Sequence, residues 1–228
     1  MNKYAVAFSK NGYIKYTSHL DMLRLFKRAF RRSGIDLAYS RGYNPHPRMG
    51  FAQPLSLGYS ADFEILEFDS DENCDPKELK ERIHGLPEGI RILSAARLPS
   101  GRKSLAACCR SAVYDVRFPI PFYQKDYPKV VQDFLSLDEI MALKRQKKTK
   151  KLREVDIRSK IRRIRAVPDE QNRLVLELEL DCGSQSNLSP ELVIQAFTKY
   201  DGEETPRYEI EIRRKSLGFD LDYQIEWM

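Results

Sequence analysis

Four cations recur at helical spacing near the start of the sequence, where together they could bind a polyanion. They are Arg24, Lys27, Arg28 and Arg31. The spacing i, i+3, i+4 and i+7 places all four on one face of a helix, where like charges cost roughly a few tenths of a kcal/mol per pair. Only Asp21 offsets them within the segment. Contacts with phosphates would compensate for this repulsion, so we expect RNA binding here; a solvated helix face is the alternative.

A second cationic tract covers residues 144–165, with twelve Lys or Arg and two acidic residues. We expect a basic loop over 144–153 and then a strand that carries cations on one face. Such a surface can follow a phosphate backbone over several nucleotides; a solubilising loop is the alternative. The expected RNA contacts in this tract are Lys147, Lys148, Lys150, Lys151, Arg158, Lys160 and Arg162.

A loop at residues 39–51 interleaves aromatic and basic side chains between two prolines and two glycines. The prolines at 45 and 47 stiffen the backbone. Aromatic rings can stack on unpaired bases while arginines bind phosphates. The expected RNA contacts here are Arg41, Tyr43, His46 and Arg48. The alternative is a structural loop whose aromatic rings fill the core.

Only three histidines are present, at positions 19, 46 and 84. His19 and His46 are candidates for acid–base cleavage of RNA through the 2′-hydroxyl group, although a single histidine is more often structural. The sequence has no H-x-x-x-H pair, Walker loop, G-x-G-x-x-G or G-x-S-x-G motif. We therefore expect neither a metal nor a cofactor.

Composition indicates a soluble protein. The net charge is +6 and the isoelectric point about 9.0, which is compatible with nucleic-acid binding. No apolar run is long enough to span a membrane, and the start MNKYAVAFSK does not resemble a signal peptide. The four cysteines form no CxxC motif, so we expect reduced thiols and a cytoplasmic location.

The elements that must position these residues follow the same order in both halves of the chain. The first half predicts strand 3–9, helix 19–33 with Ser18 as N-cap, strands 50–57 and 60–69, helix 75–84 and strand 90–97. The second half predicts strand 112–118, helix 126–143, strands 152–166 and 173–181, a helix from Ser189–Pro190 to 199, and strand 207–215. Two β-α-β-β-α-β units predict an α+β fold with two tandem ferredoxin-like domains. We expect these domains at 1–98 and 111–228, the second with the basic loop 144–153.

Several runs of this sequence resemble DUF2344, a bacterial family of radical-SAM-linked proteins. The runs are YTSHLD at 16–21, RAFRRSG at 28–34, AYSRGYNPHPR at 38–48 and FAQPLSLG at 51–58. The resemblance implies a partnership with a separate radical-SAM iron–sulfur enzyme and a role near RNA processing. The chain has no CxxxCxxC motif and is not expected to hold the catalytic cluster itself.

The duplicated element order is also distantly similar to the CRISPR repeat-processing endoribonucleases, which would assign His19 a role in cleavage. The glycine-rich C-terminal loop of that group is missing, since only Gly218 stands near the end; this favours binding over cleavage. The leading hypothesis is therefore an RNA-binding accessory protein that works with a radical-SAM enzyme in tRNA or rRNA modification or processing. The alternatives are a metal-independent endoribonuclease using His19 or His46 and a protein-interaction adaptor that binds no nucleic acid.

Overall fold

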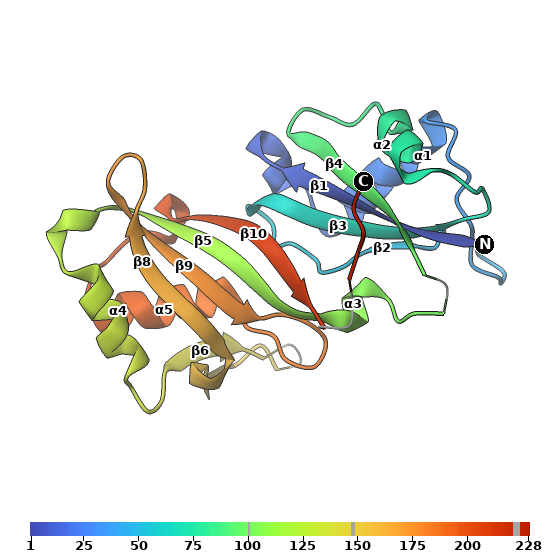
Figure 1. The fold of residues 1–228 in the computed structure, drawn as a ribbon. Coiled ribbons are helices and arrows are strands. Elements are labelled where there is room, and N and C mark those ends of the chain that lie inside the picture. Colours follow the sequence, from blue (N-terminus) through green and yellow to red (C-terminus); the bar gives the residue numbers. More distant parts are fainter. Residues whose placement is uncertain (100, 147–148, 221–223) are drawn as a thin grey trace. The chain divides into compact units, whose positions relative to one another are not determined.

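The computed structural model describes residues 1–99, 101–146, 149–220 and 224–228 (Figure 1). The chain forms two compact units. Unit 1 contains Met1–Arg110 and Ser216–Met228, and unit 2 contains Ser111–Lys215. The end of the chain, which we predicted as part of the second domain, thus belongs to unit 1.

Unit 1 has the expected β-α-β-β-α-β order. Its elements are β1 (Asn2–Lys10), η1 (Gly12–Tyr16), α1 (His19–Arg32), β2 (Met49–Phe51), β3 (Ser60–Ser70), α2 (Pro76–Arg82), β4 (Ile90–Leu98) and α3 (Leu105–Cys108). The strands lie in the order β4-β1-β3, and the short β2 also pairs with β3. All of these pairings are antiparallel.

The two faces of the unit 1 sheet are covered by different parts of the chain. Alternate residues of β1 point to opposite faces, so Phe8 packs on Phe26 of α1, with 4.8 Å between ring centroids. Ala5 lies in a second apolar cluster on the other face, against which residues of the C-terminal tail pack. There, Trp227 meets Phe63 edge to face at 5.5 Å. The tail therefore completes the core of unit 1.

Unit 2 repeats the order with an inserted hairpin. Its elements are β5 (Cys109–Pro121), η2 (Phe122–Gln124), α4 (Tyr127–Leu135), β6 (Met141–Arg145), β7 (Leu152–Asp156), η3 (Arg158–Lys160), β8 (Ile161–Pro168), β9 (Arg173–Asp181), α5 (Pro190–Asp201), η4 (Arg207–Glu209) and β10 (Glu211–Phe219). The sheet order is β10-β5-β9-β8. The helices α4 and α5 meet through Phe134 and Phe197, whose ring centroids are 5.5 Å apart. The first two residues of β5 and the last four of β10 belong to unit 1.

The predicted helix 126–143 is wrong beyond Leu135. The α4 helix ends at Leu135, and the N–H group of the next residue, Ser136, donates to the carbonyl groups of Gln132 and Asp133. Residues 141–145 then pair with 152–156 as the β6–β7 hairpin. The apolar spacing of 137–143 is compatible with a helix or a strand, and cross-strand pairing favours the strand.

Two further strand predictions are corrected. The strand expected over 152–166 is interrupted by the 3₁₀ turn Arg158–Lys160, because the Asp156 carboxylate accepts hydrogen bonds from the Ile140 and Arg158 backbone N–H groups, both at 2.9 Å. The strand expected over 50–57 is confined to Met49–Phe51. The predicted α+β class is confirmed. The strand orders of both units agree with two ferredoxin-like domains, and that finer description stays a prediction.

Candidate nucleic-acid interface

Helix α1 has one buried and one basic face, as its sequence predicts. Ser18 caps the helix by accepting from the Asp21 backbone N–H at 3.2 Å. The buried side chains are Met22, Phe26, Ala29 and Phe30. The residues Arg24, Lys27, Arg28 and Arg31 are all exposed. The helical period that buries the first set therefore presents all four cations to solvent.

The four cations differ in their surroundings. Arg24 forms an ion pair with Asp21 at 2.8 Å. The pKa of the Asp21 carboxyl is lowered by hydrogen bonds from the Ser18 hydroxyl and then from Arg24. Neither Arg28 nor Arg31 has an ion-pair partner among the described residues. These two guanidinium groups keep their donors available for an external anion.

A groove runs along this face of α1. The α1 groove has a volume of about 640 Å³ and is lined by Leu25, Arg28, Arg31, Arg32, Gly85, Leu86 and Pro87. Arg32 donates to the Gly85 carbonyl at 2.5 Å, which fixes its guanidinium group against the loop after α2. Gly85 has a φ of +72°, and a Cβ atom there would lie 2.9 Å from the Arg32 guanidinium carbon. The groove thus combines an apolar lining with two available arginines.

The aromatic loop adjoins α1 at Tyr39. The Lys27 ammonium group lies over the Tyr39 ring, 5.7 Å from its centroid, and 48% of Tyr39 is exposed. Cation–π contacts of this kind hold a ring beside a charge. The basic face of α1 and the aromatic loop 39–51 are therefore neighbours in the structure.

Hydrogen bonds within the loop hold its shape. The Ser40 N–H donates to the His46 carbonyl at 2.8 Å, and the His46 N–H donates to the Ser40 hydroxyl at 3.0 Å. Tyr43 is fully exposed, and Arg41 and His46 are exposed as well. Arg48 instead forms an ion pair with the buried Asp69 at 2.7 Å. Arg41, Tyr43 and His46 are thus accessible to a ligand, whereas Arg48 also anchors the loop to β3.

His19 has a structural setting distinct from that of His46. Its ring meets the Phe51 ring at 5.3 Å between centroids. It lines a cavity of about 20 Å³ together with the buried side chains of Lys10 and Glu64. The Lys10 ammonium group donates to the carbonyls of Lys15 and Thr17 at 3.3 and 3.2 Å, and so holds the chain before α1. The cavity has room for about one water molecule.

The cations of unit 2 are arranged differently from the prediction. Arg158 donates to the Leu135 carbonyl at 3.0 Å, and Arg162 forms an ion pair with Asp181 at 2.8 Å. Because a 3₁₀ turn contains Arg158 and Lys160, the prediction that they share a strand face with Arg162 is wrong. These contacts of Arg158 and Arg162 stabilise unit 2, and their role in RNA binding stays a prediction.

The described residues of the predicted loop 144–153 belong to the distal part of the β6–β7 hairpin. Lys144 and Arg145 belong to β6, and the Gln146 N–H donates to the Lys151 carbonyl at 2.9 Å. Lys150 and Lys151 are exposed. Lys147 and Lys148 lie outside the described residues. The exposed lysines therefore project from a paired hairpin.

Sequence reasoning missed part of the α1 groove. Arg32 and residues 85–87 are not among the RNA contacts that the sequence predicts. Their position beside α1 depends on the path of the chain after α2, which no local motif encodes. Within the described part of the chain, no group of three or more His, Cys, Asp or Glu could hold a metal ion. No helix among the described residues is long and apolar enough to cross a membrane.

Comparison with protein families identifies the chain. The model of an uncharacterized protein family conserved in bacteria, DUF2344, matches residues 3–190. This match covers most of the chain, and the chain belongs to this family. No curated protein matches the chain.

Proposed function

We propose that this DUF2344 protein binds RNA on the exposed face of α1 and acts as an accessory protein to a radical-SAM enzyme in tRNA or rRNA modification or processing. The observation that carries the RNA part is the position of Arg28 and Arg31 beside the apolar lining of the α1 groove. Single-stranded RNA presents phosphates and unstacked bases together. Guanidinium groups suit the phosphates, and apolar or aromatic side chains suit the bases.

The surroundings of the groove support the same proposal. Tyr39 adds an exposed ring beside Lys27, and the hydrogen-bonded loop adds Arg41 and Tyr43. A loop that is ordered before binding costs less entropy when it binds. The radical-SAM partner rests on the family resemblance alone. A cytoplasmic setting agrees with four cysteines that are buried thiols.

The test is a binding measurement on the full chain with two matched double variants. Arg28→Glu/Arg31→Glu reverses the groove charges, and Lys77→Glu/Lys80→Glu reverses two exposed lysines of α2. Both variants lower the net charge equally. Fluorescence anisotropy with a structured RNA such as tRNA should show a loss of affinity of about tenfold or more for the arginine pair, because contacts to phosphate become repulsive. The lysine pair should lose much less, and an equal loss in both variants would contradict a localised site.

A second candidate is a metal-independent endoribonuclease, and the observation that favours it is the shared cavity of His19, Lys10 and Glu64. A ribonuclease of this kind needs an acid and a base within reach of the scissile phosphate. Among the described residues, no hydrogen bond or ring contact joins His19 to His46. We therefore rank binding above cleavage.

A further inference from the structure

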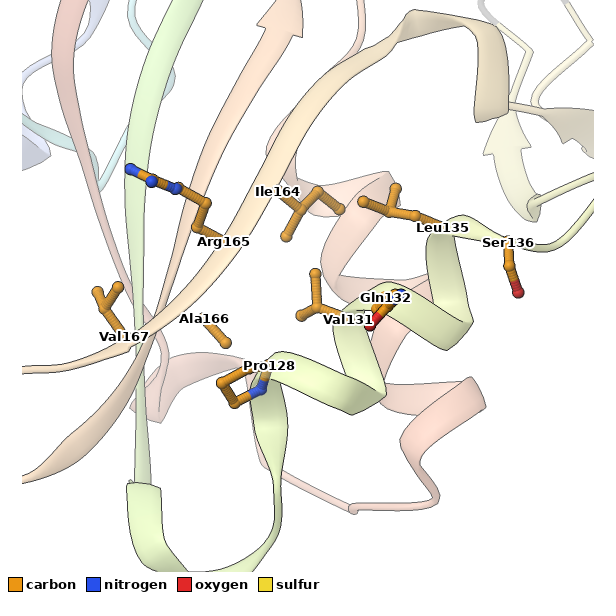
Figure 2. Close-up of a pocket in the computed structure, with 9 residues that line it drawn as sticks. All are labelled: Pro128, Val131, Gln132, Leu135, Ser136, Ile164, Arg165, Ala166 and Val167. Carbon is orange, nitrogen blue, oxygen red and sulfur yellow. The ribbon is translucent and has the colours of Figure 1, made fainter.

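A second groove lies in unit 2 between α4 and β8 (Figure 2). This β8 groove has a volume of about 720 Å³, and its lining includes Pro128, Val131 and Leu135 of α4 and Ile164 and Ala166 of β8. The volume falls within the range of sites that bury a ligand, roughly 300–1,000 Å³. The groove consists of an apolar helix face beside a strand.

Within the described part of the chain, the strand beside the groove is the last one in its sheet. The order β10-β5-β9-β8 leaves one side of β8 without a neighbouring strand among these residues. At the β8–β9 turn, the Asp169 N–H donates to the Arg173 carbonyl at 3.0 Å. Antiparallel pairs alternate between bonded and non-bonded positions, so Arg165 and Val167 bond to β9, and Ile164 and Ala166 direct their N–H and C=O groups outward.

These outward groups are available to another strand. No backbone hydrogen bond from Ile164 or Ala166 to a group outside the sheet occurs among the described residues. An open edge with an adjacent apolar groove is the arrangement in which an extended peptide adds as a new strand, with backbone bonds for affinity and side-chain pockets for specificity.

The two faces of β8 differ in chemistry, which decides what peptide fits. In Figure 2, Ile164 and Ala166 point to the α4 side, and Arg165 and Val167 point to the opposite side. On that opposite side, Arg165 is exposed and has no ion-pair partner among the described residues. Arg163 reaches Glu179 only at 3.8 Å. An added strand would therefore meet the apolar Ile164 and Ala166 on one face and the cationic Arg163 and Arg165 on the other.

We propose that β8 binds an extended segment of a partner protein in which apolar and acidic residues alternate. Side chains of a strand alternate between faces, so its apolar residues enter the β8 groove against Val131 and Leu135. Its acidic residues then lie beside Arg163 and Arg165. A second copy of β8 does not fit, because arginines would face arginines across the new pair. This site is independent of the RNA proposal for unit 1.

The probe is a synthetic peptide of about nine residues, close to a typical strand length, in which glutamate alternates with valine. The control peptide has the same composition, with the glutamates and valines grouped in two blocks. Binding to the full chain is measured by anisotropy, and hydrogen exchange of individual amides by NMR. The alternating peptide should bind at least about tenfold more tightly and slow exchange of the Ile164 and Ala166 amides.

Protein variants test the edge and the charge separately. Ala166→Pro removes one outward N–H but no bond of the β8–β9 ladder, since proline is tolerated at edge positions. This variant should bind the alternating peptide about tenfold or more weakly. Arg165→Glu should also lower the affinity for this peptide, and it should bind a peptide of alternating lysine and valine more tightly. Arg91→Glu, at an exposed position of β4, is the charge-matched control and should leave the affinity for the alternating peptide unchanged.

A peptide that is N-methylated at alternate residues tests the same backbone bonds without altering the protein, in case Ala166→Pro impairs folding. Binding that survives both N-methylation and Ala166→Pro would overturn the proposal. Unchanged exchange at Ile164 and Ala166 in saturating peptide would overturn it as well. An RNA oligomer that slows exchange at these amides, where the peptide does not, would assign the β8 groove to nucleic acid instead.

Discussion

The Lys27 ammonium group lies 5.7 Å from the centroid of the Tyr39 ring. This contact joins the basic face of α1 to the loop that carries Arg41, Tyr43 and His46. A ring beside a cation can stack on a base while the cation approaches the neighbouring phosphate. The pair is thus the point at which two separate sequence features become one surface of unit 1.

Tyr39→Leu should weaken RNA binding while leaving the fold intact. Stacking of one base on an aromatic ring contributes about 1–3 kcal/mol, and the half-exposed ring contributes less to the core than a buried one. Anisotropy and urea unfolding measure the two effects. Tyr208→Leu in unit 2, where 86% of the residue is exposed, is the matched control; equal losses from both variants would argue against stacking at Tyr39.

The salt dependence of RNA binding should report which arginines contact phosphates. Arg28→Gln and Arg31→Gln should each reduce the slope of log K against log[salt] by about 1. Arg24→Gln should reduce it less, because Arg24 is already paired with Asp21. Titrations over a range of salt concentrations measure the slopes, and identical slopes in all three variants and the unaltered protein would exclude α1 from the interface.

The stabilisation that the Asp156 carboxylate gives to unit 2 should be lost in acid. Hydrogen bonds from the Arg158 and Ile140 backbone N–H groups lower the pKa of its carboxyl. The folded-state pKa lies below the unfolded one, so this stabilisation is present above the unfolded value and is lost as pH falls through the folded value. Asp156→Asn should cost about 1 kcal/mol near neutral pH.

Urea unfolding at neutral and acidic pH measures the Asp156 contribution. The difference between Asp156→Asn and the unaltered protein should shrink toward acidic pH. Asp133→Asn, at an exposed position of α4, is the matched control. A pH-independent difference would mean that the carboxylate charge is not the cause.

Gly89→Ala should destabilise unit 1 far more than Gly101→Ala. Both glycines have positive φ, +90° and +79°, so each alanine incurs about 1–2 kcal/mol of backbone strain. At Gly89 the new Cβ would also lie 2.2 Å from the Asn11 carbonyl oxygen, whereas nothing lies within 4 Å at Gly101. Unfolding followed by the fluorescence of Trp227 measures the stability of both variants. Similar unfolding midpoints would contradict the close approach at Gly89.

The isolated protein should bind RNA without cleaving it. His19 packs on Phe51, and the exposed His46 lies in the hydrogen-bonded loop 39–51, so the two candidate histidines occupy different settings. Incubation of labelled RNA in a chelator, followed by denaturing electrophoresis, measures cleavage. Metal-free cleavage that disappears in His19→Ala or His46→Ala would promote the endoribonuclease candidate.

The sequence by itself determined the features that depend on local periodicity and local caps. The α1 helix has its predicted Ser18 cap and its predicted basic face, because the 3.6-residue period fixes which side chains share a side. The start of α5 at Pro190, after the Ser189 cap, was predictable for the same reason. The α+β class followed from the alternation of such segments.

The tertiary structure decided the features that depend on residues distant in sequence. Whether 141–143 continue a helix or start a strand depends on pairing with 154–156. Whether Arg158 and Arg162 are available depends on the Leu135 carbonyl and on Asp181. The α1 groove exists because the loop at Gly85 returns to Arg32. Spacing along a chain fixes the direction of a side chain within its own element, but its partners are set by how the elements pack.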